Sequence, residues 1–490
     1  MSLLKFNWAE GLEVGAGVIV RVIFRVGVSL AVGVAIEVGV TVGFLVGDGE
    51  AILTVGITVG IDSASSLFFG VGMGATSVIW VGTEGLLILN IKIMPNTDKI
   101  SNIIVNTIYF FESIINNTLL MKILAIETSC DDTCAAVLEN DRLLSNVISS
   151  QTDLHAKWGG VVPDIAKRAH TERIEVVIIE ALKRSKPSGP KIRTTSLDRE
   201  ALLKFLLKDI DVIAVTLGPG LAIALGVGVN KAKELAIKYY KKLIEVNHVE
   251  GHILANLIKN KLGKPERKIE FPALAMTVSG GHTKIILIQN PPCPPLTKGG
   301  LNLKYTVVGE TLDDAAGEAL DKAAKMMGLG YPGGPILERL AEKGDKKYLI
   351  LPRPLSTQKN FDYSFSGLKT SFYYQIKDWP KEKIGQNLAN LSATFQDAVF
   401  DSLLIKFKKA IEFYNPKTLL ACGGVMANLE IRKRLRKMAK EFNIPLLMPV
   451  KKQFNTDNAA MIGIVGYYKA LRGEFVEDIE SLDRNPRLEI

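Results

Sequence analysis

The sequence predicts an α/β protein that follows a low-complexity extension. From Met121 onward, short apolar runs end in polar or glycine-rich turns and lead into helix-like segments, the pattern of strands that feed helices. Before residue 121, valine and glycine alternate over long stretches such as "VGVSLAVGVAIEVGVTVGFLVG", with few charges and no histidine. A length of 490 residues suits two or three folded units.

We interpret residues 1–120 as a Val/Gly-rich extension with no part in the chemistry. The alternating valines suit strands, but glycine weakens strands and no helical face emerges. The uncharged run at residues 64–82 approaches the length of a membrane span, yet Gly, Ser and Thr dilute its hydrophobicity and no basic cluster flanks it. We therefore expect no membrane association. A segment that is disordered, or that is not native and comes from an upstream start, fits better, with Met121 as the alternative beginning.

Charge and cysteine content limit the function classes. Residues 121–490 hold 55 Lys/Arg and 42 Asp/Glu, an excess of 13 positive charges. Such an excess suits an anionic partner such as RNA, and equally a solubilising surface. The cysteines are too few and too scattered for a disulfide framework, which predicts a reducing cytoplasm. They are Cys130, Cys134, Cys293 and Cys422.

Four segments predict the α/β core. Residues 122–127, "KILAIE", form a short apolar strand that ends in the polar turn "TSCDDT". Residues 212–229 form a buried strand that feeds a buried helix, because a Gly-Pro-Gly break interrupts what could pass for a membrane span. The helical pattern continues to residue 243. Residues 273–288 predict strand, turn and strand, and residues 418–442 predict strand, turn and helix.

Glycine turns follow three of these strands, and two loops appear inserted. A strand that ends in glycine lets backbone N–H groups approach a phosphate or carboxylate, and a helix that starts there adds its positive end. Three such turns favour a nucleotide-like ligand over plain tight turns. They are Gly218/Gly220, Gly280/Gly281 and Gly423/Gly424, and "GYPGGP" at 330–335 is a fourth cluster. Residues 186–200 and 290–304 are predicted surface loops.

Two histidines lie four positions apart in "VNHVEGHIL". On a helix His248 and His252 share one face, so both can reach one metal ion. The zinc-protease motif needs glutamate directly after the first histidine, but here Glu250 stands one position later and points roughly 200° away from His248. The protease mechanism thereby loses its base. A third ligand is available in Asp457, which could equally cap the apolar helix that follows it.

Together these segments resemble the TsaD family of tRNA threonylcarbamoyladenosine synthases. The resemblance covers roughly residues 121–470 and rests on motifs that occur in the family's order. They are "AIETSCDDT", "HAKWGGVVPDIAKRAH", "HVEGH", "VSGGHT", "GETLDDAAGEALDKAAKMMGLGYPGGP", "SFSGLKT", "GGVMAN" and "TDNAAM". It implies an actin-like, sugar-kinase-like (ASKHA) fold of two ribonuclease-H-like lobes, which we expect at residues 121–245 and 246–490. It also implies transfer of a threonylcarbamoyl group from threonylcarbamoyl-AMP to the N6 amine of the adenosine 3′ of the anticodon in ANN-reading tRNAs, with release of AMP.

Site residues are carried over from the resemblance position by position. It implies iron(II), one ion per subunit, with zinc or another divalent ion as the alternative, held by His248, His252 and Asp457. It implies a substrate-binding set of Thr277, Val278, Ser279, Gly280, Gly281, Asp321, Gly334 and Asn428. Asp131 and Asp132 follow the first strand, where a carboxylate could handle a proton or approach the metal. Three positions depart from the family: Met426 replaces Ser, Asp132 replaces Glu, and Asn247 replaces a frequent His.

Partners and rival functions complete the expectations. "GGVVP" is similar to the bacterial branch of the family, which implies a TsaB-like paralogue and a TsaE-like ATPase as partners, beside tRNA and threonylcarbamoyl-AMP. An ASKHA-fold ATPase or kinase is the first alternative, although it would hold magnesium through acids rather than through a histidine pair. A metalloprotease is the second, and the position of Glu250 argues against it.

Overall fold

The computed structural model describes most of the chain after residue 119 and six strands before it. The described ranges are 120–186, 199–291, 301–449 and 452–490, together with the backbone of strands within residues 20–91. The chain divides into two compact units, Met1–Thr118 and Leu119–Ile490. Cys293 and most of the two predicted surface loops lie outside the described residues, as does most of the uncharged run at residues 64–82. None of the described helices is long and apolar enough to cross a membrane.

The first unit contains two sets of antiparallel strands. One is a sheet in the order β1-β2-β3-β4 and the other is a hairpin of β5 and β6. Their bounds are β1 Val20–Ser29, β2 Ala35–Gly47, β3 Glu50–Ile61, β4 Ser65–Ser66, β5 Thr76–Gly82 and β6 Gly85–Ile91. The extended backbone follows the alternating valine pattern of the sequence.

The second unit begins with a five-stranded mixed sheet in the order β11-β10-β7-β8-β9. β7 pairs antiparallel with β8, and β8 pairs antiparallel with β9. On its other side β7 pairs parallel with β10, and β10 pairs parallel with β11. The bounds are β7 Lys122–Glu127, β8 Asp132–Glu139, β9 Arg142–Ser150, β10 Val212–Gly218 and β11 Lys242–Asn247.

A second five-stranded sheet repeats this arrangement in the order β14-β13-β12-β15-β16. β12, β13 and β14 are antiparallel neighbours, whereas β15 and β16 run parallel to β12. The bounds are β12 Ala273–Val278, β13 Thr283–Gln289, β14 Lys304–Glu310, β15 Thr418–Cys422 and β16 Leu446–Leu447. Two sheets with the same order and directions confirm the predicted duplicated ribonuclease-H-like, actin-like architecture.

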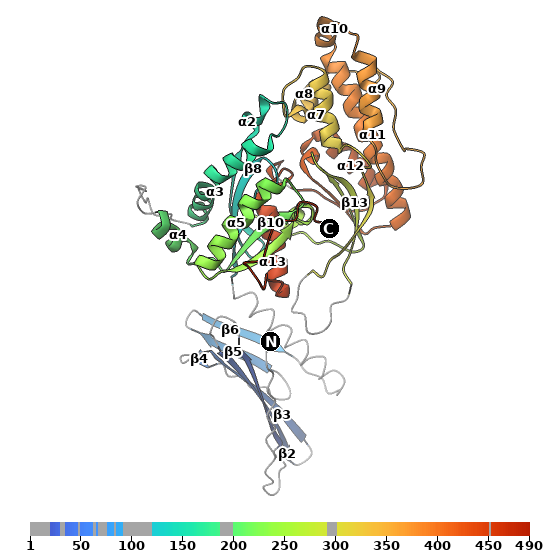
Figure 1. The fold of residues 1–490 in the computed structure, drawn as a ribbon. Helices are drawn as coiled ribbons and strands as arrows, with labels where there is room; N and C mark the ends of the chain where they lie inside the picture. The colour runs from blue at the N-terminus through green and yellow to red at the C-terminus, as the bar shows by residue number, and fades with distance from the viewer. Residues whose placement is uncertain are drawn as a thin grey trace. The chain divides into compact units, whose positions relative to one another are not determined.

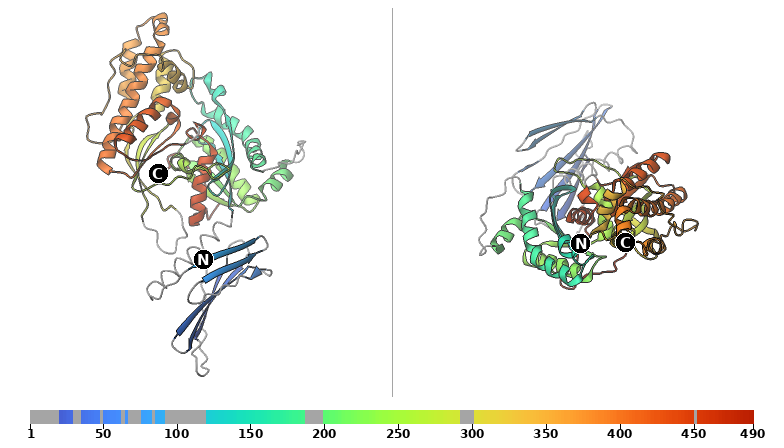
Figure 2. Two further views of the ribbon diagram at one scale, coloured as in Figure 1. Left: turned by 180° about the vertical axis from the view of Figure 1, so that it is seen from behind. Right: turned by 90° about the horizontal axis from the view of Figure 1, so that it is seen from above.

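Helices cover the outer face of each sheet (Figures 1 and 2). The outer face of the first sheet shares an apolar core with α3, α4 and α5, and that of the second sheet shares one with α7, α8, α9, α11 and α12. The bounds are α2 Thr152–Ala156, α3 Pro163–Ser185, α4 Arg199–Leu207, α5 Ala222–Lys238, α6 His248–Leu254, α7 Ala316–Met326, α8 Gly333–Ala341, α9 Ser366–Ile376, α10 Lys381–Gln386, α11 Leu388–Tyr414, α12 Leu429–Glu441 and α13 Ala459–Arg472. Short 3-10 helices are η2 Ala255–Leu257, η3 Gly424–Ala427 and η4 Lys452–Phe454.

Helices α6 and α13 lie between the two sheets and share a central apolar core with both. α13 packs on the first sheet although it comes near the end of the chain, and its glycines allow a close approach. A Cβ at Gly463 would stand 2.2 Å from Leu138, and one at Gly466 would stand 2.7 Å from Ala214. The division of the lobes at residue 245 stays a prediction. Helix α13 belongs to the second half of the chain but packs on the sheet of the first half.

The predicted core segments are present, with one correction. β7, the β10–α5 unit, the β12–β13 hairpin and the β15–α12 unit are confirmed. The helix predicted to continue to residue 243 instead ends at Lys238, and residues 242–247 form β11. Tyr240 adopts φ +53, which ends the helix. Lysine-rich sequence hid this strand, because half-buried edge strands lack a continuous apolar run.

Candidate active site

The candidate metal ligands begin at the first residue of α6. Asn247 caps this helix, and its Oδ1 accepts hydrogen bonds from the N–H groups of Val249 at 2.8 Å and Glu250 at 3.3 Å. The cap fixes the helix start at His248, and the helical repeat places His252 on the same face. The two imidazole rings lie edge to face with centroids 4.7 Å apart.

Asp457 completes a cluster with the two histidines. Its Oδ1 lies 3.5 Å from His248 Nε2 and 3.3 Å from His252 Nε2, and one ligand atom from each residue lies within 4.8 Å of the others. Ligand atoms that share a metal at about 2.1 Å are separated by about 3 Å, so a small adjustment would close them on an ion. Asp457 is not the cap of α13, because Asn458 Oδ1 accepts the Met461 N–H at 3.2 Å.

The donor set fits a divalent transition metal. Two imidazoles and one carboxylate form a set that leaves coordination positions open, as in non-haem iron(II) sites. His252 is buried; among the described residues its Nδ1 has no hydrogen-bond partner, and its Nε2 faces the Asp457 carboxylate at 3.3 Å. A buried nitrogen without a partner is costly unless a ligand satisfies it. The cluster could therefore hold a metal ion.

Glu127 and Ser129 orient His248 from the first strand. Glu127 is fully buried at the end of β7, and its Oε2 lies 3.2 Å from His248 Nδ1. It also accepts hydrogen bonds from the Ser129 N–H and the Thr216 hydroxyl. Ser129 Oγ lies 3.1 Å from the same Nδ1. Sequence analysis missed both residues, although an acid that ends the apolar run "KILAIE" was a signal.

The carboxylates control the protonation of the histidine cluster. Burial lowers the pKa of His248, but the nearby Asp457 and Glu127 carboxylates outweigh burial and raise it to about 10. Burial acts against ionisation of Asp457, yet the histidines hold the pKa of this carboxyl well below its usual range. For His252, burial dominates and lowers the pKa. Without a metal, the site holds a proton on His248, which a divalent cation would replace.

Glu250 faces away from the histidine cluster, as the helical repeat predicts. Its Oε1 accepts a hydrogen bond of 3.1 Å from the Tyr305 hydroxyl on β14. Burial raises the pKa of the Glu250 carboxyl, although Lys469 and that hydrogen bond oppose it. A base for metal-activated water must stand beside the metal. Glu250 does not meet that requirement.

Asp131 and Asp132 lie in and after the turn that follows β7. Asp132 begins β8 and pairs with Ser150 of β9. Burial raises the pKa of Asp132 to about 7, despite a hydrogen bond with Ser150, and burial also raises the pKa of Asp131. The negative charge of Asp457 also raises the pKa of both carboxyls. Neither carboxyl belongs to the cluster of His248, His252 and Asp457. A carboxyl with a pKa near neutrality can exchange protons at physiological pH.

The turn between β12 and β13 leaves an open surface at its glycines. No atom lies within 4 Å of where a Cβ would stand on Gly280 or Gly281. Ser279 closes the turn, because its N–H donates to the His282 carbonyl at 2.8 Å and its Oγ accepts the His282 N–H at 3.0 Å. Thr277 and Val278 are fully buried in β12, so their side chains are enclosed by the core.

Two predicted substrate residues have structural partners. Asp321 on α7 receives the first N–H groups of α8 on its Oδ1, from Gly333 at 2.8 Å and from Gly334 at 3.0 Å. Asn428 caps α12 through its Oδ1, and its Nδ2 donates to Gln396 Oε1 on α11 at 2.8 Å. In each residue, one side-chain oxygen accepts hydrogen bonds from the first N–H groups of a helix. The second carboxylate oxygen of Asp321, Oδ2, can accept a hydrogen bond from another partner.

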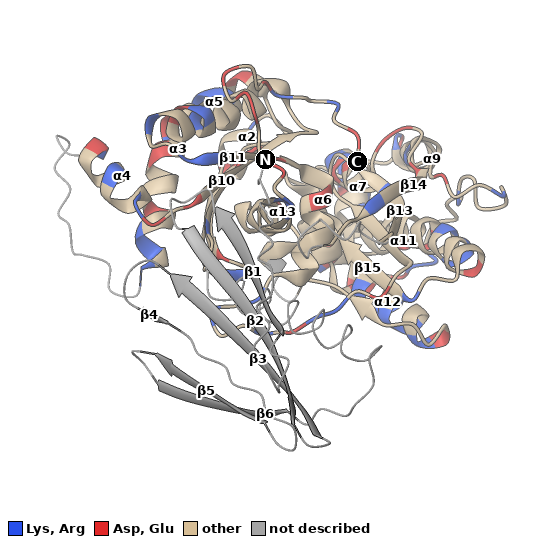
Figure 3. Cartoon of the chain, turned by 90° about the horizontal axis from the view of Figure 1, so that it is seen from below, with Lys and Arg blue, Asp and Glu red and all other residues tan. Residues whose placement is uncertain are grey.

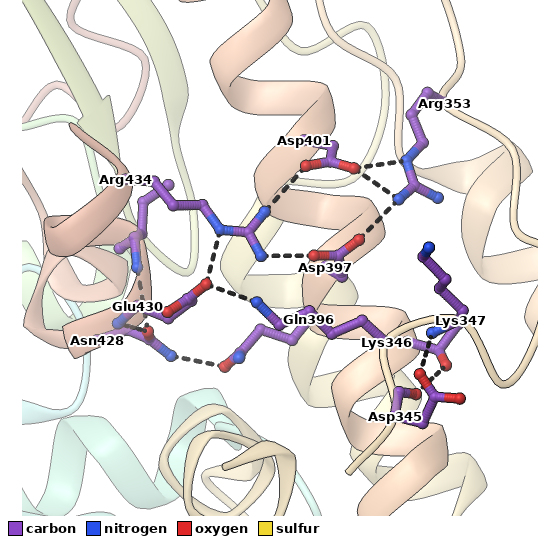
Figure 4. Close-up of polar contacts among 12 residues, drawn as sticks. Asp345, Lys346, Lys347, Arg353, Gln396, Asp397, Asp401, Asn428, Glu430 and Arg434 are labelled. Carbon is purple, nitrogen blue, oxygen red and sulfur yellow. Dashed lines mark hydrogen bonds and ion pairs between the residues drawn. The ribbon is translucent and has the colours of Figure 1, made fainter. Parts of the chain in front are cut away.

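A half-buried charge network joins α11 to α12 beside Asn428 (Figure 4). Arg434 on α12 reaches Asp397 at 2.5 Å and Asp401 at 2.9 Å on α11. Arg353, in the loop between α8 and α9, lies 3.0 Å from the Asp397 carboxylate and 2.7 Å from that of Asp401. Paired guanidinium–carboxylate contacts hold geometry well. This network keeps the Asn428 cap in place relative to Gln396.

The remaining histidines have structural partners or lie near the cluster. His282 has its ring centroid 6.4 Å from that of His248, and burial together with the neighbouring histidines lowers its pKa to about 4. His170 on α3 joins Thr133 Oγ1 at 2.8 Å and the Cys130 carbonyl at 3.0 Å. His155 contacts Gln151 and accepts the Val162 N–H at 3.2 Å. The hydrogen bonds of His170 thus connect α3 to the turn that contains Asp131, and those of His155 connect α2 to Val162.

Comparison with known proteins identifies the family. A family model described as TsaD, tRNA N6-adenosine threonylcarbamoyltransferase, matches residues 142–464. A protein of that name from Thermosipho melanesiensis is 45% identical over 350 residues, which are 71% of this chain and 94% of the relative. One from Kosmotoga olearia is 45% identical over 355 residues, which are 72% of this chain and 95% of that relative. Among solved structures, T. kodakarensis HypF is 15% identical with a TM-score of 0.44, over 74% of this chain and 50% of that one. The chain belongs to the tRNA N6-adenosine threonylcarbamoyltransferase family and is a tRNA-modifying transferase.

Proposed function

We propose that this enzyme transfers the threonylcarbamoyl group of threonylcarbamoyl-AMP to the N6 amine of the adenosine 3′ of the anticodon in ANN-reading tRNAs. The amine nitrogen forms a bond to the carbamoyl carbon, the bond from that carbon to the phosphate oxygen breaks, and AMP leaves. The amine loses one proton. The observation that carries the proposal is the cluster of His248 and His252 on α6 with Asp457 just before α13.

The metal ligands in this proposal are His248, His252 and Asp457, and the ion is iron(II), one per subunit. A bound divalent ion would polarise the carbamoyl group and offset the charge that develops during attack. Glu127 would hold the Nδ1–H of His248, so that Nε2 faces the ion. Zinc accepts the same donor types, so metal analysis decides between the two ions.

The adenylate would bind along the glycine turns. Gly280 and Gly281 offer backbone N–H groups in a turn with no side chain in the way, which suits phosphate oxygens. Asp321 would use its second oxygen for ribose hydroxyls, and Gly334 leaves room beside that carboxylate. Asn428 would contribute its remaining amide hydrogen to the adenosine, while Thr277, Val278 and Ser279 shape the turn through their backbone.

Asp132 would receive the proton from the attacking amine. Its pKa of about 7 lets the carboxylate form accept a proton at physiological pH and the acid form release it to water. Burial also raises the pKa of Asp131, beside it, so this carboxyl is a second candidate to exchange a proton. No covalent nucleophile is required, because the adenylate is already activated. Burial raises the pKa of the Cys130 thiol well above its usual range, which agrees with a passive role.

The positive charge of the second unit suits the tRNA substrate. Lysine and arginine recur along α4, α5 and α12 (Figure 3), and the solvent-facing side of α12 carries Lys433, Arg436, Lys437 and Lys440. Backbone phosphates are the natural partners of such residues. A cytoplasmic location, where tRNA is available, and a TsaB-like paralogue with a TsaE-like ATPase as partners complete the proposal.

The direct test supplies the full chain with partner proteins, iron(II), threonylcarbamoyl-AMP and unmodified ANN-reading tRNA. Mass analysis of the nucleosides should show threonylcarbamoyladenosine, and an equal amount of AMP should appear. His248→Ala should abolish both products and reduce the bound iron. A folded, iron-loaded protein that yields neither product would falsify the proposal.

Glu250→Gln separates the transferase from a metalloprotease. The substitution keeps a hydrogen-bond acceptor for Tyr305 but removes a carboxylate that could serve as base. A transferase should keep its rate of tRNA modification. A protease that relied on this carboxylate should lose its activity, so loss of peptide cleavage with Glu250→Gln would favour the alternative.

A further inference from the structure

Residues 485–490, which we call the strap, pass over the turn that ends β10. The Asn485 N–H donates to the Leu217 carbonyl at 2.8 Å, and the Gly220 N–H donates to the Pro486 carbonyl at 3.2 Å. The strap is also anchored by apolar contacts, because Leu488 packs on the core of the first sheet and Ile490 packs on the central core.

The turn beneath the strap lacks a side chain where the strap crosses. A Cβ on Gly218 would stand 1.7 Å from the Asn485 carbonyl oxygen and 3.1 Å from Leu488 Cβ. The three nearest atoms to that position all belong to the strap. The closest clashes of a side chain at this position would therefore be with the strap.

Two routes lead from the strap to His248. In the first, Asn247 Nδ2 donates to the Glu489 carbonyl at 3.0 Å, and the same side chain caps α6 at His248. In the second, the turn residue Leu221 donates its N–H to the Ser129 carbonyl at 2.7 Å, and Ser129 Oγ lies 3.1 Å from His248 Nδ1. Both supports of the metal ligand thus touch segments that the strap holds.

We propose that the strap positions His248 and thereby sets the affinity of the metal site. The inference rests on the proposed metal role of His248, His252 and Asp457. Metal affinity depends on ligands that are already aligned, and loss of groups that orient them typically weakens binding 10–100-fold. A released strap would free the Asn247 cap and the Ser129 turn together, so His248 would sample arrangements that do not face Asp457.

The test compares Gly218→Ala, a deletion of residues 485–490, and the two changes combined. Affinity is measured on the purified full chain by competition between the protein and a chromophoric chelator for Zn²⁺, and for Fe²⁺ without oxygen. Each single change should weaken binding about 10-fold or more. The combined variant should match the deletion alone, because the added methyl group then has nothing to displace.

Gly344→Ala is the matched control. A Cβ there would stand 2.0 Å from the Ala389 carbonyl oxygen, a similar backbone clash beyond the reach of the strap. It should lower stability without changing metal affinity. Asn247→Ser provides a milder variant that keeps a capping oxygen but loses the donor to Glu489, and it should weaken metal binding less than the deletion.

The outcomes separate the strap from the proposed function. If His248→Ala loses metal while the strap deletion binds it as the unaltered chain does, the strap proposal fails and the metal site stands. If His248→Ala also binds unchanged, the metal assignment fails and the strap proposal with it. A further loss caused by Gly218→Ala in the deleted chain would show that the alanine acts elsewhere, which also overturns the proposal.

Discussion

At the residue scale, the two ring nitrogens of His248 have different partners. Nδ1 lies near Glu127 and Ser129, whereas Nε2 faces Asp457. A carboxylate that accepts the Nδ1–H fixes the tautomer and makes Nε2 a better metal ligand. Glu127 has this role because it is fully buried and held by its own hydrogen-bond donors, Ser129 and Thr216.

Replacing Glu127 with glutamine should weaken metal binding about 10–100-fold. The amide keeps the size of the side chain but removes the negative charge that accepts the Nδ1–H and makes Nε2 a stronger electron donor to a metal. Chelator competition with Zn²⁺ measures the effect. Glu139→Gln, at the end of the neighbouring strand β8, should leave the affinity unchanged, and equal affinities for both variants would contradict the orienting role.

Asp132 should make the stability of the metal-free protein depend on pH. Its pKa is about 7 in the folded protein against 3.8 in the unfolded chain, so the folded state binds more protons between these values. Stability should therefore fall as pH rises from about 4 to about 7 and then level off. Asp132→Asn removes this dependence and should be more stable than the parent at pH 8 by about 1–4 kcal/mol.

Denaturant unfolding at pH 4 and pH 8 checks this expectation. The advantage of Asp132→Asn should be present at pH 8 and should have largely disappeared at pH 4, because the folded-state carboxyl is then protonated and the unfolded one lies close to its pKa of 3.8. Asp164→Asn, at an exposed position on α3, serves as the control for changing net charge. The same advantage at both pH values would mean that the asparagine acts through packing rather than through a proton.

At the element scale, the strand-to-helix turns depend on particular glycines. Gly423 adopts φ +94 between β15 and η3, and a Cβ there would stand 2.4 Å from the Val278 carbonyl. The turn after β15 therefore lies directly against β12 at the edge that carries the open glycines 280 and 281. Its neighbour Gly424 has no atom within 4 Å of a Cβ position.

Gly423→Ala should lower the free energy of unfolding by at least about 2 kcal/mol, because it adds a side chain in a left-handed conformation against backbone atoms. Gly424→Ala should change it by less than about 1 kcal/mol. Urea unfolding of both variants measures the difference. Similar values for the two alanines would show that the β15 turn can move away from β12 without cost.

At the whole-molecule scale, two sheets of the same topology enclose α6 and α13. The sheet of residues 122–247 receives α13 and the strap from the far end of the chain. Asp457 reaches the histidines because α13 packs against β7 and β8 and brings its preceding loop to the end of β7. The candidate metal cluster therefore depends on the packing of α13 against the first sheet.

Removing residues 1–118 should leave folding and tRNA modification intact, because Leu119–Ile490 is compact on its own and contains every proposed site residue. Thermal unfolding and the nucleoside assay measure the two properties. A chain that starts at residue 128 lacks β7, the central strand of the first sheet, and should not fold. Loss of modification after removal of residues 1–118 alone would give the extension a part in the chemistry.

Sequence reasoning worked where a short segment contains its own signal. Continuous apolar runs identified β7, β10, β12 and β15, and the spacing of His248 and His252 placed both on one face of α6. It failed for β11, an edge strand whose sequence KLIEVN follows Lys238 and Lys241 and therefore resembled the end of the preceding helix. It also missed Glu127: the acid at the end of "KILAIE" was a signal, but its contact with His248 joins residues 121 positions apart and has no local pattern.

Local sequence patterns were sufficient to predict the fold class, the family and the residue types that can bind a metal and a nucleotide. These depend on periodicity, glycine turns and motif order, which short segments encode. Only the tertiary structure decided that Asp457 faces the histidines while Asn458 caps α13, and that the strap reaches Asn247. Such contacts join residues far apart in the chain, so they depend on how the two sheets pack together and not on any local pattern.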